Sequence, residues 1–372
     1  MKGFDTMRKL KRILLIILIV VLIGPTVLVI LNFIPVAPFS YKGVNSFRKT
    51  DKYPIIIPHG GAKELAPENT IYSYDMLVND FNAGVLEIDL ALTKDGILMA
   101  HHDLDLEFSE ASSMNGALIR DYTYQEIIDE YENDDYYLAR NFVDARTNTK
   151  PFESSPKADL ATMIPAKLGD DIFNIYGDTV LYILEIKDSP TSNYYEAGSD
   201  RYKLAANELL RLVKMYDLEK NVVLASFSDS VIGYFHEKAP DMMYNAGVDE
   251  VTKFAVYSAF YFDFFWRTKS QVLILPNRTS MEPITGKTAD LLDKVPKFFS
   301  KNIAIKTDAG YEPNLMNKRV IKAAHRKNMA CFYWTINDPD EMRELIKLGA
   351  DGIITDRPDL LKEIIDELKN AE

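Results

Sequence analysis

The chain has 372 residues, of which 47% are hydrophobic and 26% charged, so it can bury a full core, and about 250 residues suffice for one barrel-sized domain. Its formal net charge of −12 excludes a broad electrostatic attraction to nucleic acid, because phosphate backbones are bound by clustered Lys and Arg. Cys331 is the only cysteine, which excludes an internal disulfide and a cysteine-rich zinc site.

The N-terminal region is an apolar stretch preceded by basic residues. Residues 13–31 carry no charge and are mostly Ile, Leu and Val; at about 1.5 Å per residue they nearly match the hydrocarbon core of a bilayer. Basic side chains in residues 1–12 predict that this end is cytoplasmic. The sequence therefore predicts a single-pass anchor in the cell membrane over 13–34, with the remaining chain extracytoplasmic. A cleaved signal peptide is the alternative.

The rest of the chain is expected to form one domain after a linker. Residues 35–52 contain Pro, Gly and scattered polar groups without periodicity, which indicates a juxtamembrane linker. Over 53–372, short β-rich runs alternate with helix-period segments, which predicts parallel β/α units. The candidate strands are 55–57, 85–93, 97–100, 180–186, 222–225, 242–245, 271–275, 303–305, 330–335 and 352–355. A barrel takes eight strands, and we expect 271–275 and 303–305 to be short excursions from it.

Three other segments have distinct patterns. An amphipathic helix is expected to begin at Asn69 or Thr70, either of which can cap it. Residues 104–166 are too long for an ordinary barrel loop, and their acidic, Tyr-rich pattern predicts a small helical insertion over the site. The aromatic segment 254–266 could contact the lipid interface or pack in the core.

Acidic side chains alternate with apolar ones along 85–93. Period two places Glu87 and Asp89 on one face of the strand and Leu and Ile on the other. The two acids are expected to face a barrel lumen or a cleft, because a closed apolar core would impose a large desolvation cost on them. Glu185 and Lys187 share a face in the same way. The position of these polar residues favours a barrel over an open doubly wound sheet.

Two histidines follow candidate strands. His59 comes after the run 55–57 and precedes two glycines, and His102 comes after the run 97–100. Side chains at the carboxyl ends of barrel strands face the loops that form active sites. The pair could therefore act as general acid and general base on a phosphodiester.

A group of acids could bind a cation beside these histidines. Glu87, Asp89 and Glu185 offer the oxygen ligands that hard cations such as Ca²⁺ or Mg²⁺ prefer. Spacing alone leaves open the alternative that these acids form ion pairs with Lys187 and other bases.

Several short motifs occur in a recognisable order. They are His59-Gly60-Gly61, Pro67-Glu68-Asn69-Thr70, Glu87-Ile88-Asp89, Thr93-Lys94-Asp95-Gly96, His102-Asp103, Leu184-Glu185-Ile186-Lys187, Ser226-Phe227, Trp334-Thr335-Ile336-Asn337 and Gly349-Ala350-Asp351-Gly352-Ile353-Ile354-Thr355-Asp356-Arg357-Pro358. In this order and spacing they resemble the glycerophosphodiester phosphodiesterase family, from about Ile55 to Leu361. Agreement of many motifs is far more specific than any one of them.

The resemblance implies a TIM-type (β/α)8 barrel that hydrolyses glycerophosphodiesters to glycerol 3-phosphate and an alcohol. It also implies roles for matched positions: a divalent cation at Glu87, Asp89 and Glu185, acid and base at His59 and His102, phosphate near Lys187, and glycerol beside Trp334. The alternatives are cleavage of intact phospholipids by a phospholipase C or D type reaction and a catalytically silent envelope-binding protein. The oligomeric state is left open.

One position departs from the family pattern. Members commonly have His-Arg-Gly where this chain has His59-Gly60-Gly61. Loss of a bidentate guanidinium should weaken phosphate binding unless Lys187, Lys63 or the metal compensates. The change could mean an altered substrate preference, a slower enzyme or a subfamily variant with more exposed backbone N–H groups. We expect the last of these, with Gly60 among the residues that contact the substrate.

Overall fold

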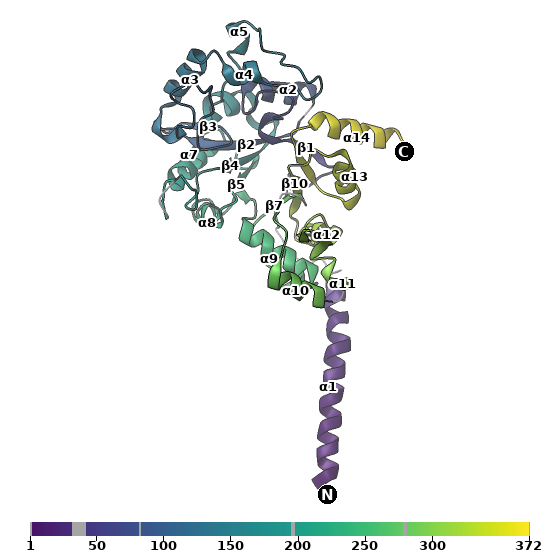
Figure 1. Ribbon diagram of the computed structural model, residues 1–372. Coiled ribbons are helices and arrows are strands. Elements are labelled where there is room, and N and C mark those ends of the chain that lie inside the picture. The colour runs from purple at the N-terminus through teal and green to yellow at the C-terminus, as the bar shows by residue number, and fades with distance from the viewer. Residues whose placement is uncertain are drawn as a thin grey trace.

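The computed structural model describes residues 2–31, 42–81, 83–194, 198–277, 281–295 and 297–371. Within these residues, parallel strands form a barrel with helices on its outer face (Figure 1). Its strands are, in order around the barrel, β1 (Ile55–Pro58), β2 (Val85–Leu92), β4 (Leu181–Ile186), β5 (Val222–Ala225), β6 (Met243–Tyr244), β7 (Val272–Pro276), β10 (Ala330–Trp334) and β11 (Gly352–Thr355).

Hydrogen bonding divides the barrel into two sheets that meet at two seams. One sheet has the order β1-β11-β10-β7, and the other has the order β3-β2-β4-β5-β6. At the first seam, Asn245 forms a parallel bridge with Val272, and the N–H of Ala246 donates to Val272 O at 2.9 Å. At the second seam, β1 lies beside β2, and the N–H of Gly60 donates to Glu87 Oε2 at 2.8 Å. The strands therefore close on themselves.

The outer helices follow the strands in chain order. They are α2 (Ile71–Asp80), α7 (Tyr202–Met215), α8 (Asp229–Lys238), α9 (Val248–Ala259), α12 (Lys318–Arg326), α13 (Pro339–Leu348) and α14 (Pro358–Asn370). Thr70 caps α2, as one of the two expected candidates: its side chain accepts from the N–H of Ser73. Leu86, Ile88 and Leu90 of β2 pack under the helices, as the period-two pattern predicted.

Inward-facing side chains form a second, smaller core inside the barrel. It includes Ile57, Val85, Ile183, Val223, Met243, Val272, Phe332 and Ile354. On five of these strands, the residue two positions later in the chain also faces inward and is polar or aromatic. These residues are His59, Glu87, Glu185, Trp334 and Asp356. The lumen is thus apolar toward the amino ends of the strands and polar at their carboxyl ends, where barrel active sites lie.

The segment before β1 is partly packed rather than a free linker. Residues 35–41 of the expected linker lie outside the described residues. Phe47 is fully buried in the lumen core, with its ring 6.5 Å from that of Phe332. Asn45 donates to Gln271 O, and Arg48 pairs with Asp351 at 3.0 Å. Residues 45–48 therefore close the amino end of the barrel.

Two runs were expected to lie outside the barrel, and the expectation was right for 303–305 and wrong for 271–275. The run 271–275 lies in barrel strand β7, whereas 97–100 lies in β3 (Leu98–Ala100), which pairs antiparallel with β2. Only residues 93–97 connect β2 to β3, and parallel strands need a crossover of about a dozen residues or more. The run 303–305 lies in the antiparallel pair β8 (Ala304–Thr307) and β9 (Gly310–Pro313), outside the barrel.

Two excursions extend from the carboxyl end of the barrel. The expected insertion contains α3 (Tyr124–Asn133), α4 (Tyr137–Asn141) and α5 (Lys157–Leu160). Its apolar side chains pack with one another and against Ala91, Met99 and Tyr72 of the barrel domain. The second, between β7 and α12, holds β8, β9, α10 (Gly286–Lys294) and α11 (Lys297–Ser300). The strand pattern predicted only the run 303–305 of this excursion. In the remaining crossover after β3, a π-helix (Leu168–Phe173) continues into α6 (Asn174–Tyr176).

The N-terminal helix α1 (Lys2–Leu31) contains residues 13–31 of the predicted anchor. Its described apolar side chains, such as Ile16 and Val20, are exposed, while the side chains of residues 22, 25, 28 and 29 and the predicted span's end at 32–34 lie outside the described residues. Across the described part of the chain, no helix combines the length and the apolar character needed to cross a membrane.

The aromatic segment 254–266 has two kinds of environment. Phe254 is buried and its ring lies 6.3 Å from that of Trp266, as core packing predicted. Tyr257, Phe260 and Phe262 are exposed. The segment therefore both packs against the barrel and contributes aromatic surface.

Candidate active site

His59 stands directly after β1 and is oriented by a carboxylate from the last barrel strand. Its Nδ1 lies 2.8 Å from Oδ1 of Asp356. Burial alone would raise the pKa of Asp356, but the hydrogen bond and charge of His59 lower it overall. An ionised carboxylate only accepts hydrogen bonds, so Nδ1 of His59 carries a proton and Nε2 is left for the reaction.

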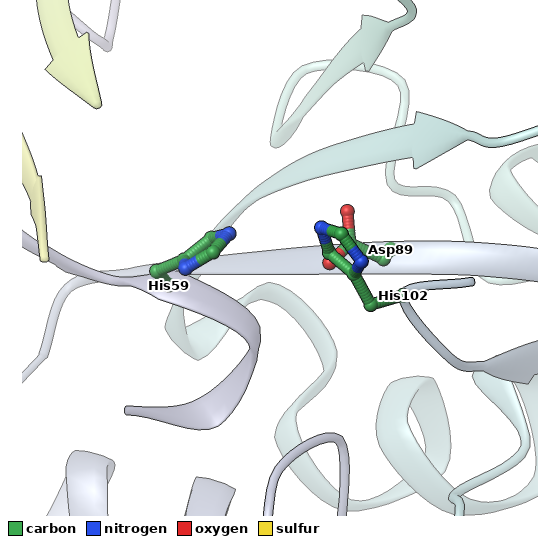
Figure 2. Close-up of side chains that lie close together, drawn as sticks. All are labelled: His59, Asp89 and His102. Carbon is green, nitrogen blue, oxygen red and sulfur yellow. The ribbon is translucent and has the colours of Figure 1, made fainter. Parts of the chain in front are cut away.

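His102 faces His59 from the loop after β3. The two imidazole rings lie 5.9 Å apart at 88°, and Figure 2 shows them turned toward one another with the carboxylate of Asp89 beside them. Burial lowers the pKa of His102, as does the nearby Lys187. Burial would also lower the pKa of His59, but the bond to Asp356 and the charge of Glu87 raise it overall. The two histidines are therefore shifted in opposite directions.

The three predicted acids converge in the lumen beside these histidines. One oxygen each from Glu87, Asp89 and Glu185 lies within 4.8 Å of the others, and a second such group joins His59, Asp89 and His102. Burial, together with the charge of Asp89, raises the pKa of Glu87 to about 8. Burial also raises the pKa of Glu185 to about 7, although Lys187 opposes the shift. Because the three carboxylates repel one another, a positive charge between them is stabilised.

Lys187 supplies part of that charge. Its Nζ lies 3.0 Å from Asp89 Oδ1 and 3.5 Å from Glu185 Oε2. Burial would raise the pKa of Asp89, but Lys187 and the two histidines lower it overall. The ion-pair alternative thus describes a real contact, yet one ammonium cannot neutralise three carboxylates.

The acids also fit a divalent cation. Asp89 Oδ2 is buried and has no hydrogen-bond partner among the described residues, and an unpaired buried carboxylate oxygen is costly. All three ligands are oxygens, the donor type that Ca²⁺ and Mg²⁺ prefer. The site can therefore bind a divalent metal beside Lys187.

Gly60 serves a different purpose from the one expected. Its N–H donates to Glu87 Oε2 at 2.8 Å, and the residue is buried, so this group positions a carboxylate instead of facing the substrate. Its φ of 51° lies in the left-handed region that glycine adopts at little cost.

Lys63 occupies the space above Gly60. A Cβ on Gly60 would lie 2.7 Å from Cε of Lys63 and 3.6 Å from its Nζ. The ammonium pairs with Glu68 at 2.8 Å. Its charge also helps to lower the pKa values of Asp89 and Asp356. A cation is therefore present where the missing arginine side chain would begin.

Trp334 closes the pocket on the side opposite the acids. It lines the same pocket as His59, His102 and Glu185, and its ring lies 5.0 Å from that of Phe227. Its Nε1 is buried without a partner among the described residues. This indole N–H is available to a ligand.

The sequence prediction missed the residues that orient His59. Asp356 accepts from Asn337 Nδ2 at 2.7 Å, and the N–H of Asp356 donates to Asn337 Oδ1 at 2.9 Å. Both residues were present in the quoted motifs, but no role was given to them. The sequence did contain a signal for Asp356, because this residue directly follows a candidate strand, as His59 does.

Comparisons with known proteins agree with this geometry. Residues 59–360 match the model of the Glycerophosphoryl diester phosphodiesterase family. A glycerophosphodiester phosphodiesterase of Bacillus altitudinis is 23% identical over 318 residues, which cover 84% of this chain and 99% of that protein. One from Caldanaerobacter subterraneus is 23% identical over 315 residues, covering 84% and 97%.

Solved structures show the same fold. A glycerophosphoryl diester phosphodiesterase domain from Mycobacterium tuberculosis superposes with a TM-score of 0.58 at 11% identity, covering 85% of this chain and 99% of that one. A structure from Silicibacter pomeroyi described as a glycerophosphoryl diester phosphodiesterase gives a TM-score of 0.55 at 18% identity, covering 87% and 96%. These similarities show a TIM-type barrel.

Proposed function

The chain belongs to the glycerophosphoryl diester phosphodiesterase family and is an enzyme that hydrolyses glycerophosphodiesters, and we propose that His59 and His102 exchange the protons of this reaction beside a divalent cation. The observation that carries the proposal is the convergence of both imidazoles with three buried carboxylates in one lumen. The products are glycerol 3-phosphate and an alcohol.

His59 is the proton donor and His102 the proton acceptor. Paired titratable groups whose pKa values are pushed apart commonly divide the acid and base roles in this way. The raised pKa of His59, held by Asp356 despite burial, keeps a proton for the leaving alkoxide. The lowered pKa of His102, caused by burial and Lys187, leaves a free nitrogen to accept a proton from water or from the neighbouring glycerol hydroxyl.

Glu87, Asp89 and Glu185 would hold Ca²⁺ or Mg²⁺. When bound, such a cation supplies positive charge that stabilises the phosphate oxygens during displacement. Gly60 fixes one oxygen of Glu87, and Lys187 fixes one oxygen each of Asp89 and Glu185. These contacts orient the carboxylates and leave Asp89 Oδ2 to the cation.

Lys63 compensates for the arginine that Gly60 replaces. Its side chain passes over Gly60 and its charge acts on Asp89 and Asp356. An ammonium is a mobile point charge and lacks the planar fork of arginine. Lys63 therefore attracts the phosphate with less geometric selectivity than arginine would.

We further propose that α1 anchors the enzyme in the cell membrane with the barrel outside the cytoplasm. Support comes from the uncharged run 13–31, the basic residues before it and the exposed apolar side chains of its described part. The full chain should sediment with membranes, a chain starting at residue 42 should not, and protease added to intact cells should digest the barrel. Protection of the barrel from that protease would contradict the orientation.

Two substitutions test the chemistry directly. Glu185→Gln and His102→Ala should each abolish hydrolysis of glycerophosphocholine while leaving the unfolding midpoint nearly unchanged. Glu208→Gln, on the outer helix α7, is the matched control and should retain activity. Full activity in both site variants would refute the proposal.

A further inference from the structure

A large apolar pocket adjoins the catalytic pocket at the carboxyl end of the barrel. Its volume is about 620 Å³, within the usual range for small-molecule sites. It lies between α9, the end of β7 and the second excursion, whose Met281, Ile284 and Leu315 line it. We call it the chain pocket.

The chain pocket and the catalytic pocket share one wall. Phe227, Ile274 and Trp334 line both of them. The rings of Phe227 and Trp334 lie 5.0 Å apart at 51°, so the two pockets meet at an aromatic pair. The chain pocket therefore lies next to the catalytic pocket, with this aromatic pair at their boundary.

The lining of the chain pocket selects for hydrocarbon. Its polar side chains are Thr252, Glu282, Asn302 and Asn314, and the other lining residues are apolar. A sugar, glycerol or choline group would lose hydrogen bonds to water on entering it, whereas an alkyl chain gains from leaving water. Val248 and Val256 line the pocket and are 53% and 45% exposed, so the pocket is accessible from outside.

We propose that the chain pocket binds one hydrocarbon chain carried on the glycerol of the substrate, so that the enzyme cleaves single-chain lipid phosphodiesters of the lysophospholipid type. This inference rests on the proposed function, because the phosphate must occupy the site beside His59 and His102. Water supplies the oxygen of the new P–O bond, and the P–O bond to the headgroup breaks. The headgroup leaves as an alcohol with a proton, and the phosphate stays on the acylglycerol.

A chain-length series tests the proposal. The full-length enzyme is assayed with Ca²⁺ or Mg²⁺ on glycerophosphocholine and on its 1-acyl derivatives, all below their micelle-forming concentrations. Transfer of each methylene out of water predicts a rise in kcat/KM of about threefold to fourfold per added carbon until the pocket is full. If glycerophosphocholine is cleaved but kcat/KM does not rise with chain length, the chain pocket is not a substrate site. If no diester is cleaved, the proposed function itself fails.

Variants on α9 locate the effect. Ala255→Trp fills the pocket, and Lys253→Trp adds the same bulk on the exposed face of the helix. Ala255→Trp should lower kcat/KM for the longest chain at least tenfold and leave that for glycerophosphocholine unchanged, whereas Lys253→Trp should change neither.

Val256→Asp provides a second variant at a half-exposed position, where folding is not at risk. Its charge at the mouth of the pocket should produce the same selective loss. Equal losses on all substrates in both Ala255→Trp and Val256→Asp, with unchanged unfolding midpoints, would overturn the proposal.

Discussion

The Nδ1 atom of His59 lies 2.8 Å from Oδ1 of Asp356, although 297 positions separate the two residues in the chain. The contact exists because β1 and β11 are neighbours and pair in register, with Pro58 opposite Thr355. Each strand ends at the same level, and the next residue of each faces the lumen. Barrel closure between the first and last strands thus creates the oriented imidazole.

Asp356 acts through His59, as a positioning residue, and its replacement should affect the rate more than binding. Asp356→Asn should lower kcat about 100-fold, within the range of general acid–base contributions, with little change in KM. The pKa of His59 should fall because Asp356 no longer raises it. Since a general acid works only while protonated, the high-pH limb of the kcat profile should move to lower pH.

The control for this experiment is Asp359→Asn, which lies on α14 and pairs with Arg357. It should leave both kcat and the pH profile unchanged. If Asp356→Asn lowers kcat by the same factor at every pH, so that the pH profile does not shift, the carboxylate acts by some route other than His59.

The assignment of acid and base predicts different responses to the leaving group. A glycerophosphodiester of nitrophenol has a leaving group that needs no proton, so His59→Ala should regain most of its lost activity on it. His102→Ala should stay inactive on the same substrate because the nucleophile still needs a base. Initial rates on nitrophenyl and choline esters give the comparison. Rescue of His102→Ala instead of His59→Ala would reverse the two roles.

The sequence was sufficient to predict the barrel, the lumen-facing acids and the position of the two histidines. Period two in 85–93 fixed the direction of Glu87 and Asp89 relative to the helices, and both are buried in the lumen. Which runs leave the barrel was harder to predict, since all of them have strand composition. Connection length would have identified β3, because residues 93–97 are too few for a parallel crossover.

Contacts between distant segments could not be predicted from local pattern. Phe47 lies in a stretch without periodicity, and only the closed barrel provides the cavity that buries it. The chain pocket likewise depends on how the second excursion lies against α9. Neither arrangement has a signature in the spacing of residues.

Metal binding should stabilise the protein more at high pH than at low pH. The carboxyl pKa values of Glu87 and Glu185 are raised to about 8 and about 7, so the metal-free folded state holds protons that the unfolded state has lost. Its stability therefore falls as pH rises from about 4.5, the unfolded value, through these pKa values. A cation must displace the same protons, so its affinity rises over this range.

Unfolding midpoints with and without Ca²⁺ or Mg²⁺ provide the measurement. At a concentration 100 times Kd the stabilisation at pH 8.5 should be about 2.7 kcal/mol, and it should be much smaller at pH 5. Glu87→Gln removes one ligand and one titrating group, and it should weaken both the metal effect and its pH dependence. Equal stabilisation at both pH values would argue against these carboxylates as the ligands.

Lys63 should contribute to substrate binding. Lys63→Met keeps the aliphatic stem and removes the charge, and the loss of one charge-assisted contact should raise KM roughly tenfold or more. Lys63→Arg should retain most of the affinity because the charge is kept. Lys347→Met, on the exposed surface of α13, controls for the change in net charge. Steady-state kinetics on glycerophosphocholine separate KM from kcat, and an unchanged KM in Lys63→Met would exclude the proposed compensation for Gly60.

Phe47 should contribute to stability rather than to chemistry. Phe47→Ala opens a cavity at the amino end of the lumen, next to Phe332, and such truncations cost about 3–5 kcal/mol. Val44→Ala, at an 87% exposed position of the same segment, should have almost no effect. Because the catalytic groups lie at the opposite end of the barrel, kcat of the folded Phe47→Ala fraction should be unchanged. Denaturant unfolding measures the loss, and equal stability of the two variants would show that residues 45–48 are a linker after all.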